Sequence, residues 1–205
     1  MTIATARALL VEYGHRLIRD RLTVGTAGNL SLLVEDVVAI TPSGVPYDRI
    51  AEADIVLVDA DGTPREGKPS SELPLHRAIY AGTDARAVVH THSPYATALA
   101  TVFADELPPI HYTTAILGGP VPVVPYSTYG TQALADACRA ALTHRSAALL
   151  QSHGVVAYGS TLPEAYERAQ LVEWLAEVYT HASRVGEPRL FDSAELERVA
   201  QKLRQ

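Results

Sequence analysis

Cysteine is nearly absent from the sequence, which has one, Cys138, among its 205 residues. A lone cysteine excludes an internal disulfide and is typical of proteins from the reducing cytoplasm. Long apolar runs are also lacking, and residues 1–20 carry acids and arginines where a secretion signal would have its apolar core. We therefore expect a cytoplasmic protein with neither a membrane span nor a signal peptide.

Positive charge is not in excess either. The net charge is −6, and the lysines and arginines are scattered along the chain. Nucleic acids and anionic membranes attract proteins through basic patches, so we expect neither as a partner. A phosphorylated small molecule is compatible with this charge, because one local pocket of hydrogen-bond donors is enough to bind it.

The composition indicates a globular protein with a substantial core, since 47% of the residues are hydrophobic and 20% are charged. The length favours a single domain over residues 1–205. Strands cluster before the first crossover helix, which favours an α/β fold of the α+β type with a mainly antiparallel central sheet flanked by helices. Apolar periodicity and turn residues predict helices at 2–20, 71–82, 94–103, 131–142, 162–183 and 193–204, strands at 29–34, 37–41, 54–62 and 86–92, a pair of strands within 147–159, and a loop at 107–130.

An apolar strand ends in two histidines in the stretch AVVHTHSPYATA, residues 87–98. Because residues two apart in an extended chain share a face, His90 and His92 place their imidazoles side by side. Two neutral imidazoles suit a transition metal. A strand end near the surface can also carry two histidines without a role, so the pair alone leaves both interpretations open.

A third histidine repeats this setting. His153 follows an apolar strand in LLQSHGVVAYG, where Gly154 allows a sharp turn. Three histidines leave an open coordination position, as catalytic metal sites do, although His153 alone is more often structural. Glu72 offers a carboxylate at a helix start, where an acid is also favourable against the helix dipole alone.

Three loops have the residue types that bind anions. Glycines expose backbone N–H groups, side-chain amides donate, and Ser hydroxyls lie in turns, one of them at a helix N-terminus. Each loop by itself is also ordinary loop composition, and none has the P-loop spacing. The three loops are GTAGNLS (25–31), in which Asn29 is a side-chain donor, TPSG (41–44) and PSSE (69–72).

Six motifs occur in the order and spacing of one known family: GTAGNLS, ITPSGVPYD, GKPSSE, VVHTHSPYATA, IHYTTA and LLQSHGVVAYG. On them the sequence resembles the class II aldolase/adducin family from about residue 5 to residue 180. The resemblance is closest to the family's aldolases of ketose 1-phosphates, and it implies cleavage of L-fuculose 1-phosphate or a close relative. The implied products are dihydroxyacetone phosphate and an aldehyde, formed through a metal-stabilised enediolate.

The resemblance also implies roles for individual residues. His90, His92 and His153 would hold Zn2+ or another divalent transition metal, with Glu72 as both a displaceable ligand and the acid/base. Tyr112 would donate a proton from a neighbouring subunit of a homotetramer whose active sites lie between subunits. A phosphorylated sugar would lie with its phosphate against Gly28, Asn29, Ser43, Gly44, Ser70 and Ser71.

Metal chemistry also follows from the reaction itself. An enediolate is too basic to form unaided, and a divalent cation stabilises its charge as a Lewis acid. A Schiff-base route has only Lys68 and Lys202 to use, and Lys68 lacks the apolar surroundings that would activate it. One departure concerns the C-terminus: the comparable aldolases have a longer tail with a tyrosine that closes over the site, and here no tyrosine follows Tyr179.

Other readings stay open. Sister enzymes of the family are pentulose-5-phosphate 4-epimerases, methylthioribulose-phosphate dehydratases and sugar-acid phosphate decarboxylases. The epimerases carry aspartate where Glu72 stands, which counts against them. A non-catalytic adducin-like scaffold would have no reason to keep three histidines, Glu72 and Tyr112 together. A cupin is an all-β jelly roll, which the long helix predicted at 162–183 excludes.

Overall fold

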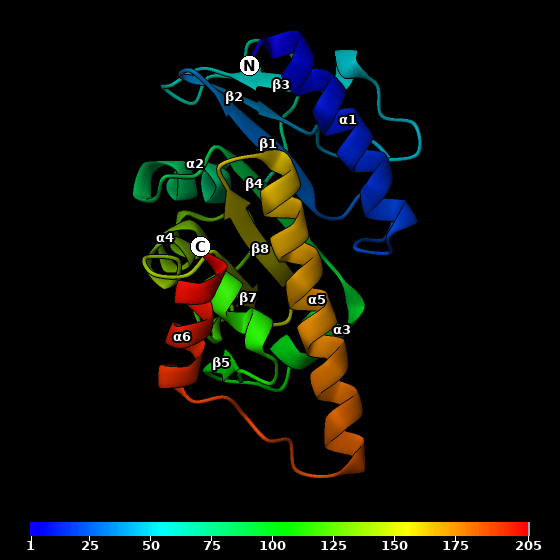
Figure 1. The fold of residues 1–205 in the computed structure, drawn as a ribbon. Coiled ribbons are helices and arrows are strands. Elements are labelled where there is room, and N and C mark those ends of the chain that lie inside the picture. The colour runs from blue at the N-terminus through cyan, green and yellow to red at the C-terminus, as the bar shows by residue number, and fades with distance from the viewer. Residues whose placement is uncertain (205) are drawn as a thin grey trace.

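An eight-stranded sheet runs through the centre of the protein in a computed structural model that describes residues 1–204 (Figure 1). The strand order is β3-β2-β1-β4-β8-β7-β6-β5, and neighbouring strands are antiparallel except for the parallel pair β6 and β7. The mainly antiparallel sheet is therefore confirmed. The strands are β1 (Asn29–Val34), β2 (Val37–Ile40), β3 (Val56–Val58), β4 (Ala87–Thr91), β5 (Glu106–Leu107), β6 (Val121–Val124), β7 (Ala147–Leu150) and β8 (Gly154–Gly159).

Helices cover both faces of this sheet. Helices α1, α3 and α5 bury their apolar residues in one cluster on one face, and α2 and α4 bury theirs in a second cluster on the other face (Figure 1). The elements are α1 (Ile3–Arg19), the 3-10 helix η1 (Glu52–Asp54), α2 (Leu73–Gly82), α3 (Pro94–Ala100), the 3-10 helix η2 (Tyr112–Leu117), α4 (Gln132–Ala141), α5 (Leu162–Val185) and α6 (Ser193–Leu203).

The central strands lie between the two helical layers, and this explains their composition. Every residue of β4 and β7 is buried, so these strands are continuous apolar runs apart from His90 and Thr91 at the end of β4. A strand that is buried on both faces has little freedom to slip in register. The sheet is therefore a firm support for side chains at the strand ends.

Three predictions about elements need correction. The predicted loop at 107–130 contains β6 and η2, and it begins at the last residue of β5. The strand predicted at 54–62 is limited to β3, because a turn follows it. The helix predicted at 94–103 is limited to α3, because a turn follows Ala100. Gln205, the last residue of the predicted domain, lies outside the described residues.

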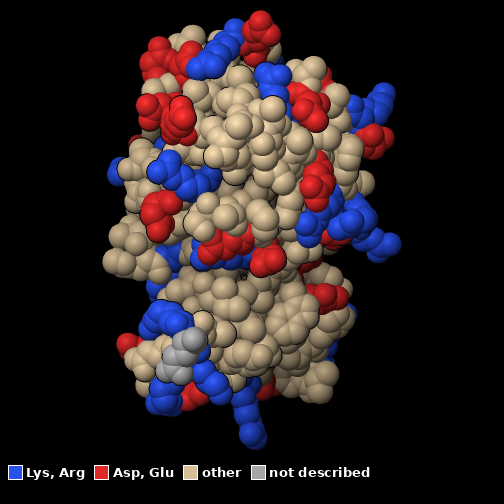
Figure 2. Space-filling view, turned by 45° about the horizontal axis from the view of Figure 1, so that its top comes forward, with Lys and Arg blue, Asp and Glu red and all other residues tan. Residues whose placement is uncertain are grey.

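The surface fits the scattered charge of the sequence. Acidic and basic side chains are interspersed on the face drawn in Figure 2, and no continuous basic area covers it. Within residues 1–204, no helix is both long enough and apolar enough to cross a membrane.

Candidate active site

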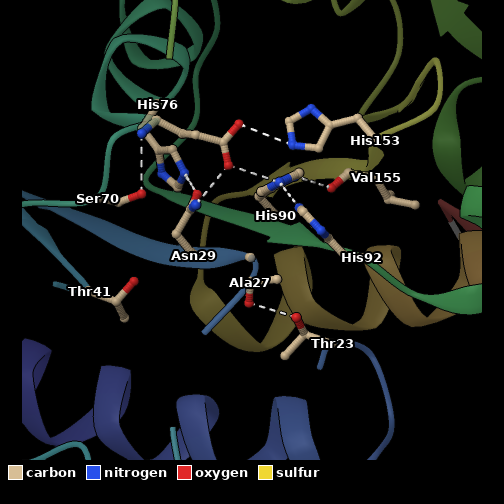
Figure 3. Close-up of polar contacts among 12 residues, drawn as sticks. Thr23, Ala27, Asn29, Thr41, Ser70, His76, His90, His92, His153 and Val155 are labelled. Carbon is tan, nitrogen blue, oxygen red and sulfur yellow. Dashed lines mark hydrogen bonds and ion pairs between the residues drawn. The ribbon is translucent and has the colours of Figure 1, made fainter. Parts of the chain in front are cut away.

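His90 and His92 lie at the end of β4, and their imidazoles do meet. The ring centroids are 4.8 Å apart, and the two Nε2 atoms are 2.9 Å apart. His90 is completely buried, and its Nδ1–H donates to the carbonyl oxygen of Val155 at 2.8 Å (Figure 3). This backbone contact holds the ring so that Nε2 points at the site, as an outer hydrogen bond does for metal-binding histidines.

His153 reaches the same place from the turn between β7 and β8. Its ring centroid lies 4.8 Å from that of His90 and 4.9 Å from that of His92. The turn is tight: Ser152 has a φ of 54°, in the left-handed region that non-glycine residues rarely adopt. A Cβ on Gly154 would overlap the carbonyl oxygen of Thr91, so only glycine fits where β8 starts beside β4.

Glu72 completes the cluster from the residue that precedes α2. Its side chain is buried, with Oε2 3.0 Å from Nε2 of His90 and Oε1 3.4 Å from Nε2 of His153. Asn29 donates from Nδ2 to Oε2 at 3.0 Å. This contact exists because Asn29 in β1 pairs with His90 in β4 across the sheet. Within residues 1–204, Oε1 has no hydrogen-bond partner.

The charges of the cluster are strongly coupled. Burial disfavours a charged Glu72, but attraction to His90 and His153 and hydrogen bonds from His90 and Asn29 outweigh it, so the pKa of Glu72 lies below its usual range. At His90 burial is likewise outweighed by Glu72, and the pKa is raised. Burial, reinforced by repulsion from His90, lowers the pKa of His92 to about 3 and that of His153 to about 4. His92 and His153 are therefore neutral at pH 7, the form that binds a metal.

The residues present fit a divalent transition metal. One ligand atom from each of Glu72, His90, His92 and His153 lies within 4.8 Å of the others. Three imidazole nitrogens and a carboxylate oxygen without a hydrogen-bond partner form a donor set that suits zinc and its neighbours in the first transition row. The four predicted ligands are thus brought together by β4, the β7–β8 turn and the start of α2.

A cavity of about 440 Å³ opens beside the cluster. Gly28 and Gly44 in its wall have φ values of 74° and 77°, which favour glycine and expose backbone N–H groups. A Cβ on Gly28 would lie 2.6 Å from the carbonyl oxygen of His90, so the loop before β1 is held close to this predicted ligand. The wall includes all six predicted anion-binding residues, namely Gly28, Asn29, Ser43, Gly44, Ser70 and Ser71.

The cavity also has residues that sequence reasoning missed. Tyr126 and Tyr129 line it and are 63% and 64% exposed, and Ser127 and Ser152 lie near them. Tyr126, Ser127 and Tyr129 follow β6 in the segment PYSTYG, residues 125–130. The available signal was this polar, aromatic run after the apolar VPVV, but its meaning depends on recognising VPVV as a strand.

Tyr112 is not brought to this cavity by its own chain. It begins η2, is 47% exposed and is not among the residues that line the cavity. Its ring lies against that of His111, tilted by 36° with the centroids 4.4 Å apart, and His111 contacts Trp174 of α5 edge-on at 4.8 Å.

Comparisons with known proteins agree with this geometry. Residues 8–180 match the family described as Class II Aldolase and Adducin N-terminal domain. A 5-deoxy-D-ribulose 1-phosphate aldolase from Bacillus thuringiensis is 39% identical over 98% of this chain and 97% of its own length. An L-fuculose phosphate aldolase from Escherichia coli K12 is 41% identical over 84% of this chain and 81% of its own.

Solved structures show the same relationship. An L-fuculose 1-phosphate aldolase superposes with a TM-score of 0.94 at 38% identity, covering 98% of this chain and 97% of the other. The L-fuculose-1-phosphate aldolase from Thermus thermophilus gives a TM-score of 0.79 at 31% identity, covering 90% of this chain and 98% of the other. The predicted family is confirmed. The chain belongs to the class II aldolase and adducin family and is a class II aldolase, an enzyme of the lyase class.

Proposed function

We propose that the enzyme cleaves a ketose 1-phosphate to dihydroxyacetone phosphate and an aldehyde. The observation that carries this proposal is the shared cavity: a three-histidine, one-glutamate cluster at one side and glycine, serine and asparagine donors at the other. The substrate is L-fuculose 1-phosphate or a 5-deoxypentulose 1-phosphate, since relatives of similar identity are named for each.

His90, His92 and His153 would hold zinc, with Glu72 as a displaceable ligand, and the bound ion would supply Lewis-acid stabilisation of the negative charge left when the C3–C4 bond breaks. Glu72 moves the proton at the carbon next to the carbonyl. Its Oε2 is held by Asn29 and His90, whereas Oε1 has no hydrogen-bond partner within residues 1–204. Oε1 is therefore the oxygen that exchanges the proton.

The phosphate lies against the six donors Gly28, Asn29, Ser43, Gly44, Ser70 and Ser71. All are neutral, so the bound dianion is stabilised by oriented N–H and O–H groups. Replacing one such donor, as in Ser71→Ala, should weaken binding by about 1.5–3 kcal/mol. Equal affinity of the parent enzyme for the phosphorylated and the dephosphorylated sugar would refute the phosphate site.

Tyr112, from a neighbouring subunit of a homotetramer, exchanges a proton with the aldehyde oxygen. In cleavage it accepts the proton of the C4 hydroxyl as the C3–C4 bond breaks, and in the reverse direction it returns that proton. This part of the proposal is supported by its exposure and by its absence from the cavity of its own chain. A residue of the reaction that faces solvent in one subunit can reach substrate only from another subunit.

The test is an activity screen of zinc-loaded enzyme on L-fuculose 1-phosphate and 5-deoxy-D-ribulose 1-phosphate. Release of dihydroxyacetone phosphate is measured by coupled reduction with NADH, and we expect it to stop on chelation and return with added zinc. If no ketose 1-phosphate is cleaved but a pentulose 5-phosphate is epimerised or a sugar acid loses carbon dioxide, the proposal falls and a sister reaction replaces it.

A further inference from the structure

His76 is a buried histidine that the proposed reaction does not use. It lies one helical turn after Glu72 on α2, is 0% exposed and is not one of the four cluster residues. Its Nε2 lies 2.5 Å from Oδ1 of Asn29 (Figure 3), and its Nδ1 lies 2.6 Å from Oγ of Ser31. A buried imidazole whose two nitrogens both have hydrogen-bond partners is held in one orientation, and such a ring has a role either in function or in the stability of the core.

We infer that His76 is a positioning residue: its Nε2–H fixes the side-chain amide of Asn29, so that the amino group of Asn29 donates to Glu72 and faces the cavity. The inference rests on the proposed function of Glu72 as the acid/base. It adds a residue outside the cluster and the cavity wall to the machinery that orients both.

The direction of each hydrogen bond follows from the chemistry of the groups. The carboxylate of Glu72 can only accept, so the amide of Asn29 presents Nδ2 to it, and its Oδ1 faces His76. Oδ1 also only accepts, so Nε2 of His76 carries the proton and Nδ1 has the lone pair. The hydroxyl of Ser31 then donates to Nδ1, and the hydroxyl of Tyr80 donates to Ser31 at 2.6 Å.

The opposite arrangement is excluded by two repulsive contacts. With the proton on Nδ1, the bare Nε2 would face the carbonyl oxygen of Asn29 at 2.5 Å. Relieving that contact by turning the amide would place its oxygen against the carboxylate of Glu72. The tautomer of His76 and the orientation of Asn29 are thus locked to each other.

The orientation of the Asn29 amide affects both the carboxylate of Glu72 and the side of the cavity where the phosphate is proposed to bind. Nδ2 of Asn29 carries two hydrogens, and one bond to Glu72 leaves the other for the cavity that Asn29 lines. A turned amide would present a carbonyl oxygen to the substrate phosphate and to the carboxylate at once. His76 therefore sustains phosphate binding and holds Oε2 of Glu72 through the same side chain.

The experiment separates this role from a purely structural one. Binding of inorganic phosphate to metal-free protein is titrated for the parent, His76→Leu, Asn29→Ala and the double variant. We expect His76→Leu to raise Kd about tenfold, the usual effect of losing a hydrogen bond to a charged group, and to have almost no effect when Asn29 is already alanine. An equal rise in both backgrounds overturns the inference, because it shows that His76 does not act through Asn29.

Two further variants serve as controls. His76→Gln keeps an N–H that reaches Asn29, and it should recover most of the phosphate affinity and of kcat in the zinc-loaded enzyme. Thr83→Val removes a hydrogen bond to Ile79 on the same helix, away from the cavity, and should leave phosphate binding unchanged. A His76→Leu effect no larger than that of Thr83→Val also overturns the inference.

The tautomer can be read in the parent protein, without any substrate turning over. Long-range 1H–15N spectra of the metal-free parent should show the ring of His76 protonated at Nε2, and protonation at Nδ1 overturns the inference. The signals are assigned by their loss in His76→Gln. If the parent binds no phosphate, the proposed phosphate site fails, and this spectrum still decides the role of His76.

Discussion

Removal of His92 should disturb the core less than removal of His90, because His92 is half-buried while His90 is fully buried. The three Nε2 atoms and Glu72 would bind an ion as one set, so loss of one predicted ligand should weaken binding by the others. Replacing His92 thus tests the cluster without removing the core contact that His90 makes with Val155.

We expect the parent protein to hold about one zinc per chain, as a site with three histidines and one open position does. His92→Ala should lower zinc affinity at least tenfold, since even outer-shell changes cost about 10–100-fold. The measurement is elemental analysis after dialysis against buffered zinc, with circular dichroism as the control for folding. A folded His92→Ala that retains full zinc would contradict the assignment.

The burial of His76 also predicts how the free energy of unfolding depends on pH. Burial, together with repulsion from His90, lowers its pKa to about 3. The unfolded chain has a His pKa of about 6.5, so between these values the unfolded state binds more protons. The free energy of unfolding should therefore fall as the pH drops from about 6.5 towards 3, by up to about 1.4 kcal/mol per pH unit for this one proton.

Comparing the pH dependence of stability of the parent with that of His76→Gln separates the effect of the His76 proton from the effects of the other histidines. Urea unfolding of metal-free parent and of His76→Gln is measured at several values of pH between 5 and 7.5. The parent should lose more stability on acidification, and the two curves should converge at low pH. Parallel curves would mean that His76 is protonated in the folded state as readily as in the unfolded chain.

At the scale of elements, the β7–β8 turn decides whether His153 can reach the other ligands. Gly154→Ala places a methyl group against the carbonyl oxygen of Thr91, which pushes β8 and the turn away from β4. We expect a loss of about 1–3 kcal/mol in the free energy of unfolding, the usual cost of overpacking, and a fall in zinc affinity. Urea unfolding and zinc titration measure the two effects.

Gly186→Ala is the matched control for that substitution. Gly186 follows α5 with a φ of 172°, and a Cβ there would have no atom within 4 Å. It should change the free energy of unfolding by less than about 0.5 kcal/mol. If Gly154→Ala behaves like Gly186→Ala, the close approach of β8 and β4 is not what holds His153 in place.

The elements that the sequence predicts well are those with a strong local pattern. Helix α5 has buried apolar residues that recur at helical spacing and an N-cap, Thr161, and β4 is an apolar run that ends at His90 and Thr91. Strand β6 escapes prediction because its four residues include Pro122 and its parallel pairing with β7 joins distant parts of the chain. Pairing of that kind has no local signal.

The same reasoning explains which parts of the site could be predicted. The ligands and anion loops lie in short motifs with characteristic residue types, and all of them reach the site. Tyr126 and Tyr129 depend on an unpredicted strand. The contact of His76 with Asn29 depends on how α2 packs against β1, because these residues are 47 positions apart and neither has a pattern that pairs it with the other.

At the scale of the whole molecule, η2 and α5 both expose aromatic or apolar side chains. Tyr112 and Ile116 of η2 and Trp174 of α5 are 47%, 42% and 42% exposed, and His111 links the two elements through its contact with Trp174. Clustered aromatic and apolar side chains on a surface mark contacts with other proteins. This surface is where we expect a second copy of the chain to bring Tyr112 to a site.

Assembly and catalysis can be tested together through variants that fail at different steps. Glu72→Gln should stop proton exchange on dihydroxyacetone phosphate, and Tyr112→Phe should spare that exchange while slowing cleavage by about 10²–10⁴-fold. Tyr179→Phe, whose ring packs against Phe103, is the control for losing a tyrosine hydroxyl and should retain activity. Light scattering should give a mass above that of one chain for all three.

Mixing subunits then decides whether Tyr112 acts across an interface. In a hybrid of Glu72→Gln and Tyr112→Phe subunits, some sites combine an intact Glu72 from one subunit with an intact Tyr112 from its neighbour. Such sites have a complete set of groups, so cleavage should return in the hybrid although neither parent variant cleaves well. If both groups acted within one chain, every subunit would lack one of them and no cleavage would return. A fully active monomer would exclude the interface role directly.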